Sequence, residues 1–241
     1  LAFFEKRAAL LWLINDIVIP KMESQSAFLQ SLQRDRPAKN DLIEEAVSEI
    51  STYVQKVQDM KVTGQPSDIK ASLRGLEGNA SRTYFQCLGK VVPRIYEFKN
   101  RSRRPAEDMF NSVLNYLYGI MYSRVEGALV KAGLDPYLGI LHRDDYNRPV
   151  LVFDMIEKYR IWADQVALQL CFRRLLKREM FEVEKEGYWL ADSGKKIVIP
   201  AMNDYLETVI QKDGKRRSRA VHLQEDMHKV AQYLLKHGGN D

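Results

Sequence analysis

Apolar residues recur at helical spacing along most of the chain. Near its start, Leu10, Leu13, Ile14 and Ile17 fall on one broad face of a helix. Pro20 follows this face, and a proline inside a helix removes a backbone hydrogen bond. The pattern therefore predicts a buried leading helix that ends at Pro20.

The same spacing predicts further helices and only a little β structure. The helical segments are residues 42–57, 67–73, 79–92, 109–132, 151–178, 192–211 and 220–237. Asn40 is expected to cap the first of these, and Gly133 to end the helix over 109–132. Alternating residues around Gly187 predict one small β-hairpin, and residues 212–219 a basic linker.

These elements predict a mainly α, multi-helix fold in a single domain over residues 1–241. Residues 1–66 would supply leading helices, residues 67–178 the core that carries the candidate chemistry, and residues 179–241 the hairpin and C-terminal helices. No apolar stretch approaches the roughly 20 residues that a membrane-spanning helix needs. No signal peptide is recognisable, and Cys87 and Cys171 are expected to be buried thiols in a reducing compartment.

An acidic pair stands at the start of one predicted helix. Asp154 and Glu157 are three residues apart, so both side chains leave the same face. An apolar run from Val150 to Phe153 leads into them, which indicates that this helix start is buried. A buried carboxylate pair needs a cation or hydrogen-bond donors. The alternative is a solvated acidic patch.

Two more candidate ligands lie outside that helix. Glu77 stands between Gly75 and Gly78, which would let a metal or a phosphate come close to the backbone. The alternative for Glu77 is an ion pair with Arg74 on a helix. His142 follows an apolar stretch and could close onto Asp154, or could be a structural hydrogen-bond donor. Carboxylates with one imidazole suit Mg²⁺ or Mn²⁺ better than zinc or copper.

The chain is basic, with a net charge of +5. Arg101, Arg103 and Arg104 lie in one short predicted loop, and guanidinium groups match phosphate oxygens. A hard cation beside a basic surface indicates chemistry on nucleic-acid phosphate. His222 and His228 are six residues apart on the last predicted helix and do not share a face, so we interpret them as surface residues.

Five ordered motifs together resemble one known family. They are Leu73–Gly78, Arg101–Pro105, Asn111–Gly119, Ala132–His142 and the Asp154-x-x-Glu157-x-x-Arg160 pattern. In this order they closely resemble the helical C-terminal catalytic domain of the CRISPR-associated integrase and endonuclease, the first core Cas protein (Cas-one). The resemblance covers most of the chain.

The resemblance implies a metal site and a DNA surface. Glu77, His142 and Glu157 match the metal ligands of the family, and Asp154 is the accompanying acid. Arg74, Tyr122 and Arg160 match positions near bound DNA, which we group with the arginines of the 101–104 loop. The metal would be Mg²⁺ or Mn²⁺.

The resemblance also implies an activity and partners. The expected reaction is insertion of short foreign DNA (prespacers) into a CRISPR array, by attack of a 3′-hydroxyl on a phosphodiester at the repeat boundary. This activity serves spacer acquisition in antiviral defence. Expected partners are double-stranded DNA, a second copy of the chain and a small companion subunit (Cas-two), in a prokaryotic cytoplasm without a membrane.

One departure from the family concerns its N-terminal β-rich domain, which nothing in the sequence matches. We therefore expect a catalytic half, and a fusion to a reverse transcriptase stays open. Two other functions also stay open. One is a general metal-dependent nuclease, and the other is a non-catalytic DNA-binding or assembly subunit.

Overall fold

The computed structural model describes residues 7–61, 66–137, 149–184 and 187–237. Its leading helices α1 (Arg7–Leu13) and α2 (Ile19–Leu32) are joined by a π-helical turn at Ile14–Val18. The Ile19 N–H bonds to the Ile14 carbonyl, five residues back. The prediction that Pro20 ends this helix is wrong. Pro20 lies in the first turn of α2, and the wider turn before it accommodates a residue without an N–H.

Helices α3 (Asn40–Gln58) and α4 (Pro66–Val91) pack against α2 and against each other. Asn40 begins α3 but does not act as its cap. The sequence predicted two helices, over residues 67–73 and 79–92, where α4 is one. A β-carbon at Gly75 or Gly78 would meet nothing within 4 Å, so both glycines lie on an open side of a continuous helix.

The central helix α5 (Met109–Lys131) begins and ends as predicted. The Asp108 carboxylate accepts the Asn111 N–H at 2.7 Å at the start, and Gly133 adopts φ +77° just beyond the end. The predicted helix over 151–178 is instead three pieces. They are α6 (Val150–Ile156), a 3-10 turn (Glu157–Tyr159) and α7 (Arg160–Phe172).

Two antiparallel hairpins complete the fold. The predicted one pairs β1 (Phe181–Glu184) with β2 (Gly187–Leu190). The second pairs β3 (Val209–Lys212) with β4 (Lys215–Ser218), where a basic linker was predicted. This strand pair also ends α8 (Asp192–Glu207) earlier than expected, and α9 (Arg219–His237) follows it.

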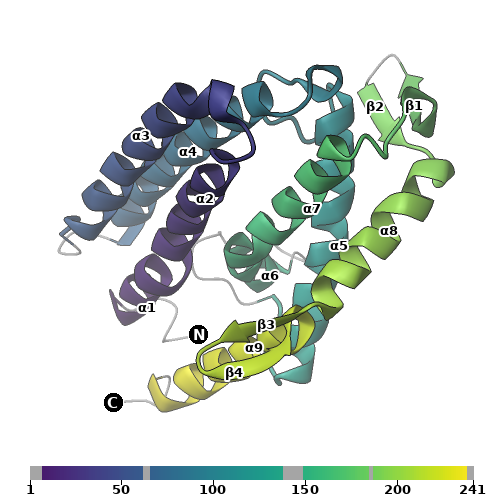
Figure 1. The fold of residues 1–241 in the computed structure, drawn as a ribbon. Coiled ribbons are helices and arrows are strands. Elements are labelled where there is room, and N and C mark those ends of the chain that lie inside the picture. Colours follow the sequence, from purple (N-terminus) through teal and green to yellow (C-terminus); the bar gives the residue numbers. More distant parts are fainter. Residues whose placement is uncertain (1–6, 62–65, 138–148, 185–186, 238–241) are drawn as a thin grey trace.

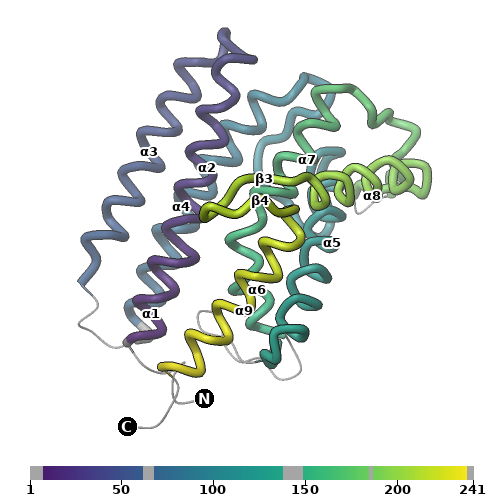
Figure 2. Tube along the Cα trace, turned by 60° about the horizontal axis from the view of Figure 1, so that its bottom comes forward, coloured from purple at the N-terminus to yellow at the C-terminus, as the bar shows by residue number. Residues whose placement is uncertain are grey.

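The elements surround one contiguous hydrophobic core. Figures 1 and 2 show α2, α3 and α4 side by side on one flank, with α5, α7 and α8 on the other. The π-helical turn before α2 packs on the 3-10 turn before α7, so the two irregular turns hold the flanks together. The mainly α prediction is confirmed. No described helix is long and apolar enough to cross a bilayer.

The tightest backbone contact beside the core lies at Gly89, in the last turns of α4. A β-carbon there would clash with the carbonyl group of Phe98. We expect Gly89→Ala to lower the free energy of unfolding by at least about 2 kcal/mol, because backbone must move to relieve the overlap. Gly119→Ala is the matched control, since its β-carbon would lie in open space on α5 and should stabilise by about 0.5 kcal/mol. Equal stabilities of the two variants in chemical denaturation would contradict this packing.

Candidate metal and nucleic-acid site

A cavity of about 550 Å³ lies between α2, α4, the α6–α7 segment and the loop near residue 101. It collects side chains from positions more than 130 residues apart, as Lys21 and Glu157 show. Most of the predicted site residues that the structure describes line it: Arg74, Glu77, Arg101, Arg103, Asp154, Glu157 and Arg160.

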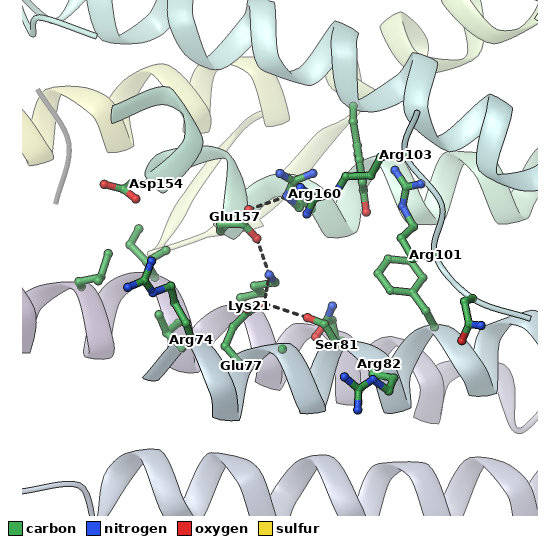
Figure 3. A pocket seen from close by; sticks show the side chains of 18 residues that line it. Lys21, Arg74, Glu77, Ser81, Arg82, Arg101, Arg103, Asp154, Glu157 and Arg160 are labelled. Carbon is green, nitrogen blue, oxygen red and sulfur yellow. Dashed lines mark hydrogen bonds and ion pairs between the residues drawn. The ribbon is translucent and has the colours of Figure 1, made fainter. Parts of the chain in front are cut away.

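Two predicted metal ligands meet at one point in this cavity. The ammonium group of Lys21 donates to Oε1 of Glu77 on α4 and to Oε2 of Glu157 on the 3-10 turn (Figure 3). Lys21 is 8% exposed, so its charge is largely withdrawn from water. The two carboxylates therefore converge on the position of a single cation.

The backbone explains why Lys21 and Glu157 face each other. Lys21 follows the π-helical turn, and Glu157 begins the 3-10 turn that packs against it. On the opposite side of that turn, the Tyr159 hydroxyl donates to Asp226 of α9 at 2.9 Å. Irregular helical turns of this kind are frequent at functional sites.

Further donors fix the two acids. Arg160 Nε donates to Oε1 of Glu157 at 2.8 Å, and Ser81 Oγ donates to Oε1 of Glu77 at 2.9 Å. Burial alone would raise the pKa of Glu157, but the charges of Lys21 and Arg160 outweigh it and lower this pKa to about 2. Glu157 is therefore ionised and ready to hold a cation near neutral pH.

Asp154 lies one helical turn before Glu157 and lines the same cavity, although it is fully buried. Figure 3 places it on the side of Glu157 away from Arg160. The expected common face of Asp154 and Glu157 is therefore present. The side-chain hydrogen bonds of the Lys21 ammonium group go to Glu77 and Glu157.

A buried tyrosine-carboxylate cluster lies behind the arginines. Asp164 is 1% exposed and accepts hydrogen bonds from Tyr84 at 3.0 Å and from Tyr118 at 2.6 Å. The guanidinium groups of Arg101 and Arg160 lie 5.1 and 4.6 Å from the centre of the Tyr118 ring. This contact links the core to the cavity wall and restricts both arginines.

The predicted DNA-contact residues divide into three groups. Arg74 and Arg103 are exposed at the cavity. Arg74 Nε donates to the Lys70 carbonyl at 3.2 Å, and the ion pair of Glu77 is with Lys21 instead of the alternative partner Arg74. Arg101 and Arg160 form the second group, since Arg101 is held by the side-chain oxygens of Asn111 and Asn115, and Arg160 by Glu157.

The third group does not line the cavity. Tyr122 packs on Phe153, with ring centres 5.3 Å apart, and Arg104 lies exposed outside the cavity. The structure thus gives these two residues no contact with the candidate cation position, and their predicted role in DNA binding stays a prediction.

The predicted third ligand, His142, lies outside the described residues. Among the residues that the structure describes, no group of three or more His, Cys, Asp or Glu side chains forms a metal cage. Glu77 and Glu157 nevertheless fit a divalent cation, because the Lys21 ammonium group stands in for one between their oxygens. Oxygen ligands of this kind suit Mg²⁺ or Mn²⁺.

Sequence reasoning missed Lys21, which directly follows Pro20, the residue at which the predicted leading helix ended. A lysine directly after an apolar helical face was the available signal, since a charge beside a buried face needs a partner. The interpretation of His222 as a surface residue is wrong. It is 3% exposed, and its Nε2 lies 3.3 Å from the Ile210 carbonyl under the β3–β4 hairpin. Cys87 and Cys171 are buried free thiols, as expected.

Comparison with known families gives a match over most of the chain. The family described as CRISPR associated protein Cas1 matches residues 2–204. The chain belongs to the Cas1 family. The family resemblance inferred from the five motifs is thereby confirmed.

Curated Cas1 relatives match at moderate identity. A CRISPR-associated endonuclease Cas1 from Archaeoglobus fulgidus is 30% identical over 226 residues, which cover 89% of this chain and 65% of the relative. One from Thermus thermophilus is 36% identical over 135 residues, 56% of this chain and 40% of the relative. The chain thus spans between two fifths and two thirds of the length of these relatives.

Solved structures share the fold of this Cas1 chain. A casposase bound to integration product has a TM-score of 0.81 at 22% identity, covering 97% of this chain and 63% of that one. A partial Cas6-RT-Cas1–Cas2 complex has a TM-score of 0.82 at 23% identity, covering 98% and 68%. At these identities the likeness establishes the fold.

The Asp164 cluster predicts how stability depends on pH. Burial raises the pKa of Asp164 from 3.8 to about 6, against the hydrogen bonds from Tyr118 and Tyr84 that lower it. Ionising this acid is thus costlier in the folded chain, and the penalty grows as pH rises from about 4 and is complete above about 6. Relative to Asp164→Asn, the unmodified chain should lose up to about 3 kcal/mol of unfolding free energy across that range. Parallel pH profiles of the two proteins in urea denaturation would refute the assignment.

Proposed function

We propose that this Cas1 chain is the catalytic domain of a metal-dependent DNA integrase that inserts short DNA duplexes into a CRISPR array. The supporting observation is the convergence of Glu77 and Glu157, from separate helical segments, on one cation position beside a basic cavity. The named relatives are endonucleases, and one neighbour of the same fold is a casposase bound to integration product.

Glu77, Glu157 and His142 would hold a Mg²⁺ or Mn²⁺ ion, with Asp154 as an accompanying acid. Such an ion, when bound, polarises a phosphoryl oxygen and offsets the charge that develops on the reacting phosphate. Ser81 and Arg160 keep the two glutamates oriented through the hydrogen bonds already described.

The arginines of the cavity would position the DNA strand. Arg74 and Arg103 are exposed there, as is Arg82, a residue that the sequence analysis did not single out. Their side chains can donate to phosphate oxygens without reading base sequence. Arg160 is restricted by Glu157 and Tyr118, so it would present its remaining N–H groups in a fixed direction.

The proposed partners follow from the same family. They are the prespacer and repeat duplexes, a second copy of the chain, and a small Cas2 companion subunit. A neighbour of the same fold is named as a Cas1–Cas2 complex that also carries a reverse transcriptase. Fusion of this chain to such a partner stays a proposal.

Two alternatives share part of this site. A general nuclease would use the same acids to cut DNA with water, and a non-catalytic subunit would use them only as ion pairs. The basic residues around the acids favour a held DNA strand. The ion pairs of Glu77 and Glu157 with Lys21 are what a non-catalytic subunit would also form, so assays of joining and of metal binding separate these two functions.

Substitution of each proposed ligand tests the site. We expect Glu77→Gln, Glu157→Gln and His142→Ala each to lower joining of a labelled duplex to plasmid by about a hundredfold or more, because the cation is lost. A chelator should have the same effect on the unmodified chain. Glu179→Gln, at an exposed acid outside the cavity, is the control.

Gel separation of joined from merely cut DNA distinguishes the alternatives. Cut but unjoined plasmid in the unmodified chain would favour the nuclease. Undiminished joining in all three variants would exclude the proposed site.

Lys21 offers a further test, because its ammonium group occupies the position proposed for the metal. Lys21→Met should lower the unfolding free energy in chelator by about 3 kcal/mol, because two partly buried acids lose their shared cation. It should also bind Mn²⁺ at least about tenfold more tightly in calorimetry, because no side chain competes for the same oxygens. Lys195→Met removes an ion pair with the exposed Asp192 and should change neither quantity appreciably.

The opposite outcome for Lys21 is equally clear. Mn²⁺ affinity that is unchanged or weaker in Lys21→Met would show that Lys21 does not stand in the metal position.

A further inference from the structure

A second charged cavity lies away from the candidate metal site. Its volume is about 470 Å³, and it opens where α2, α4 and α7 end, at the same end of the molecule in Figure 1. We call it the distal basic pocket and define it by five cations: Arg36, Lys39, Lys90, Arg94 and Arg174.

The charge of this pocket is concentrated and uncompensated. Glu97 is its single carboxylate, so the lining carries a net charge of +4, close to the +5 of the whole chain. Among the described residues, no carboxylate forms an ion pair with any of the five cations. Like charges gathered without counter-charges raise the local concentration of an anionic ligand.

Arg36 is the most constrained of the five. Its guanidinium group lies 4.1 Å from the centre of the Phe172 ring, and it is half-buried. Its buried Nε has no hydrogen-bond partner among the described residues. Contact with the ring restricts the guanidinium group, and a guanidinium group suits an oxygen anion.

Arg174 supplies a second, independent sign of a binding role. It adopts φ +53° directly after α7, a left-handed conformation that glycine or asparagine adopts at lower cost. Holding another residue in that conformation costs on the order of 1 kcal/mol. The chain carries an arginine at this position nevertheless, and its side chain lines the pocket.

Neutralising helix ends is the alternative role for these cations, because three helices end here. Each helix C-terminus contributes about half a negative charge, or roughly −1.5 for α2, α4 and α7 together. This offsets less than half of the +4 from the side chains, so a positive field remains. Helix capping therefore accounts for part of the charge and leaves the rest without a function.

Helix α4 connects the two cavities. Glu77 of the candidate metal site and Lys90 of the distal basic pocket lie on this one helix, 13 residues apart. At 1.5 Å per residue they are about 20 Å apart along its axis, the length of about six base pairs of duplex at 3.4 Å each. This is a minimum separation, because 13 residues at about 100° each place the two side chains on different faces of the helix. The metal-site cavity, which lies along the middle of α4, is also rich in arginine, so cations can face phosphates near the middle of this helix and at its C-terminal end.

We propose that the distal basic pocket binds the phosphate backbone of a DNA duplex at least about six base pairs from the phosphate that reacts at the metal site. This inference rests on the proposed DNA-integrating function and adds a second anchoring point to it. The contact is with phosphate oxygens, so it carries no sequence preference and fixes the distance between the reacting phosphate and the body of the duplex.

The test is the salt dependence of DNA binding by the full chain. The variant is Lys90→Gln/Arg174→Asn, because asparagine keeps the left-handed backbone while removing the charge. Lys131→Gln/Lys196→Gln removes two exposed cations on α5 and α8 and is the control. Anisotropy of a labelled duplex of roughly 25 base pairs, measured in chelator, gives the slope of log affinity against log salt.

We expect the slope of the pocket variant to fall by about 1 to 2 and its affinity at low salt by about tenfold or more, since each phosphate contact contributes about 0.9 to the slope. The control should change the slope by less than about 0.5. A slope equal to that of the control overturns the proposal. Lower thermal stability with an unchanged slope would also overturn it, by leaving only helix capping.

Two further arms separate this inference from others. If a polyglutamate peptide binds the unmodified chain but not the pocket variant, while DNA binding is equal in both, the pocket serves an acidic protein and the proposal fails. Glu77→Gln should lose joining and keep the salt slope of the unmodified chain. A failure of the metal site is thus distinguishable from a failure of the distal basic pocket.

Discussion

The candidate site depends on one interaction, the ammonium group of Lys21 shared between Glu77 and Glu157. Without this cation, two segments far apart in sequence would bring two negative charges together in a largely buried place, which costs several kcal/mol. The shared cation makes that convergence possible. It also explains why helical irregularities persist on both sides, since the π-helical turn and the 3-10 turn aim Lys21 and Glu157 at each other.

The same interaction sets the order of layers around it. Arg160 and Ser81 hold the carboxylates from either side, and behind Arg160 the Tyr118 ring leads to the buried Asp164. From the cavity inward, the cation of Lys21 is followed by the anion of Glu157 and the cation of Arg160, and the Tyr118 ring then connects Arg160 to Asp164. A rigid arrangement of this kind holds the carboxylate oxygens in place before a ligand arrives, which would reduce reorganisation during the proposed reaction.

Much of this could be predicted from sequence, because helical periodicity and the spacing of Asp154 and Glu157 are local signals. The Cas1 family resemblance likewise rests on motifs of a few residues each. What failed depends on tertiary context. Pro20 was read as the end of a helix, and residues 74–78 were left out of the two helices predicted around them, yet helices run through both places. Lys21 was missed because its partners lie 56 and 136 residues away, a separation that periodicity cannot register.

The central claim is that Glu77 and Glu157 share one divalent cation. Anomalous diffraction from crystals of the unmodified chain soaked in Mn²⁺ tests it most directly. The account predicts one anomalous peak about 2 Å from an oxygen of each glutamate, with the Lys21 side chain moved aside. The claim is contradicted if Lys21 still bridges both carboxylates at saturating Mn²⁺ and any anomalous peak lies elsewhere.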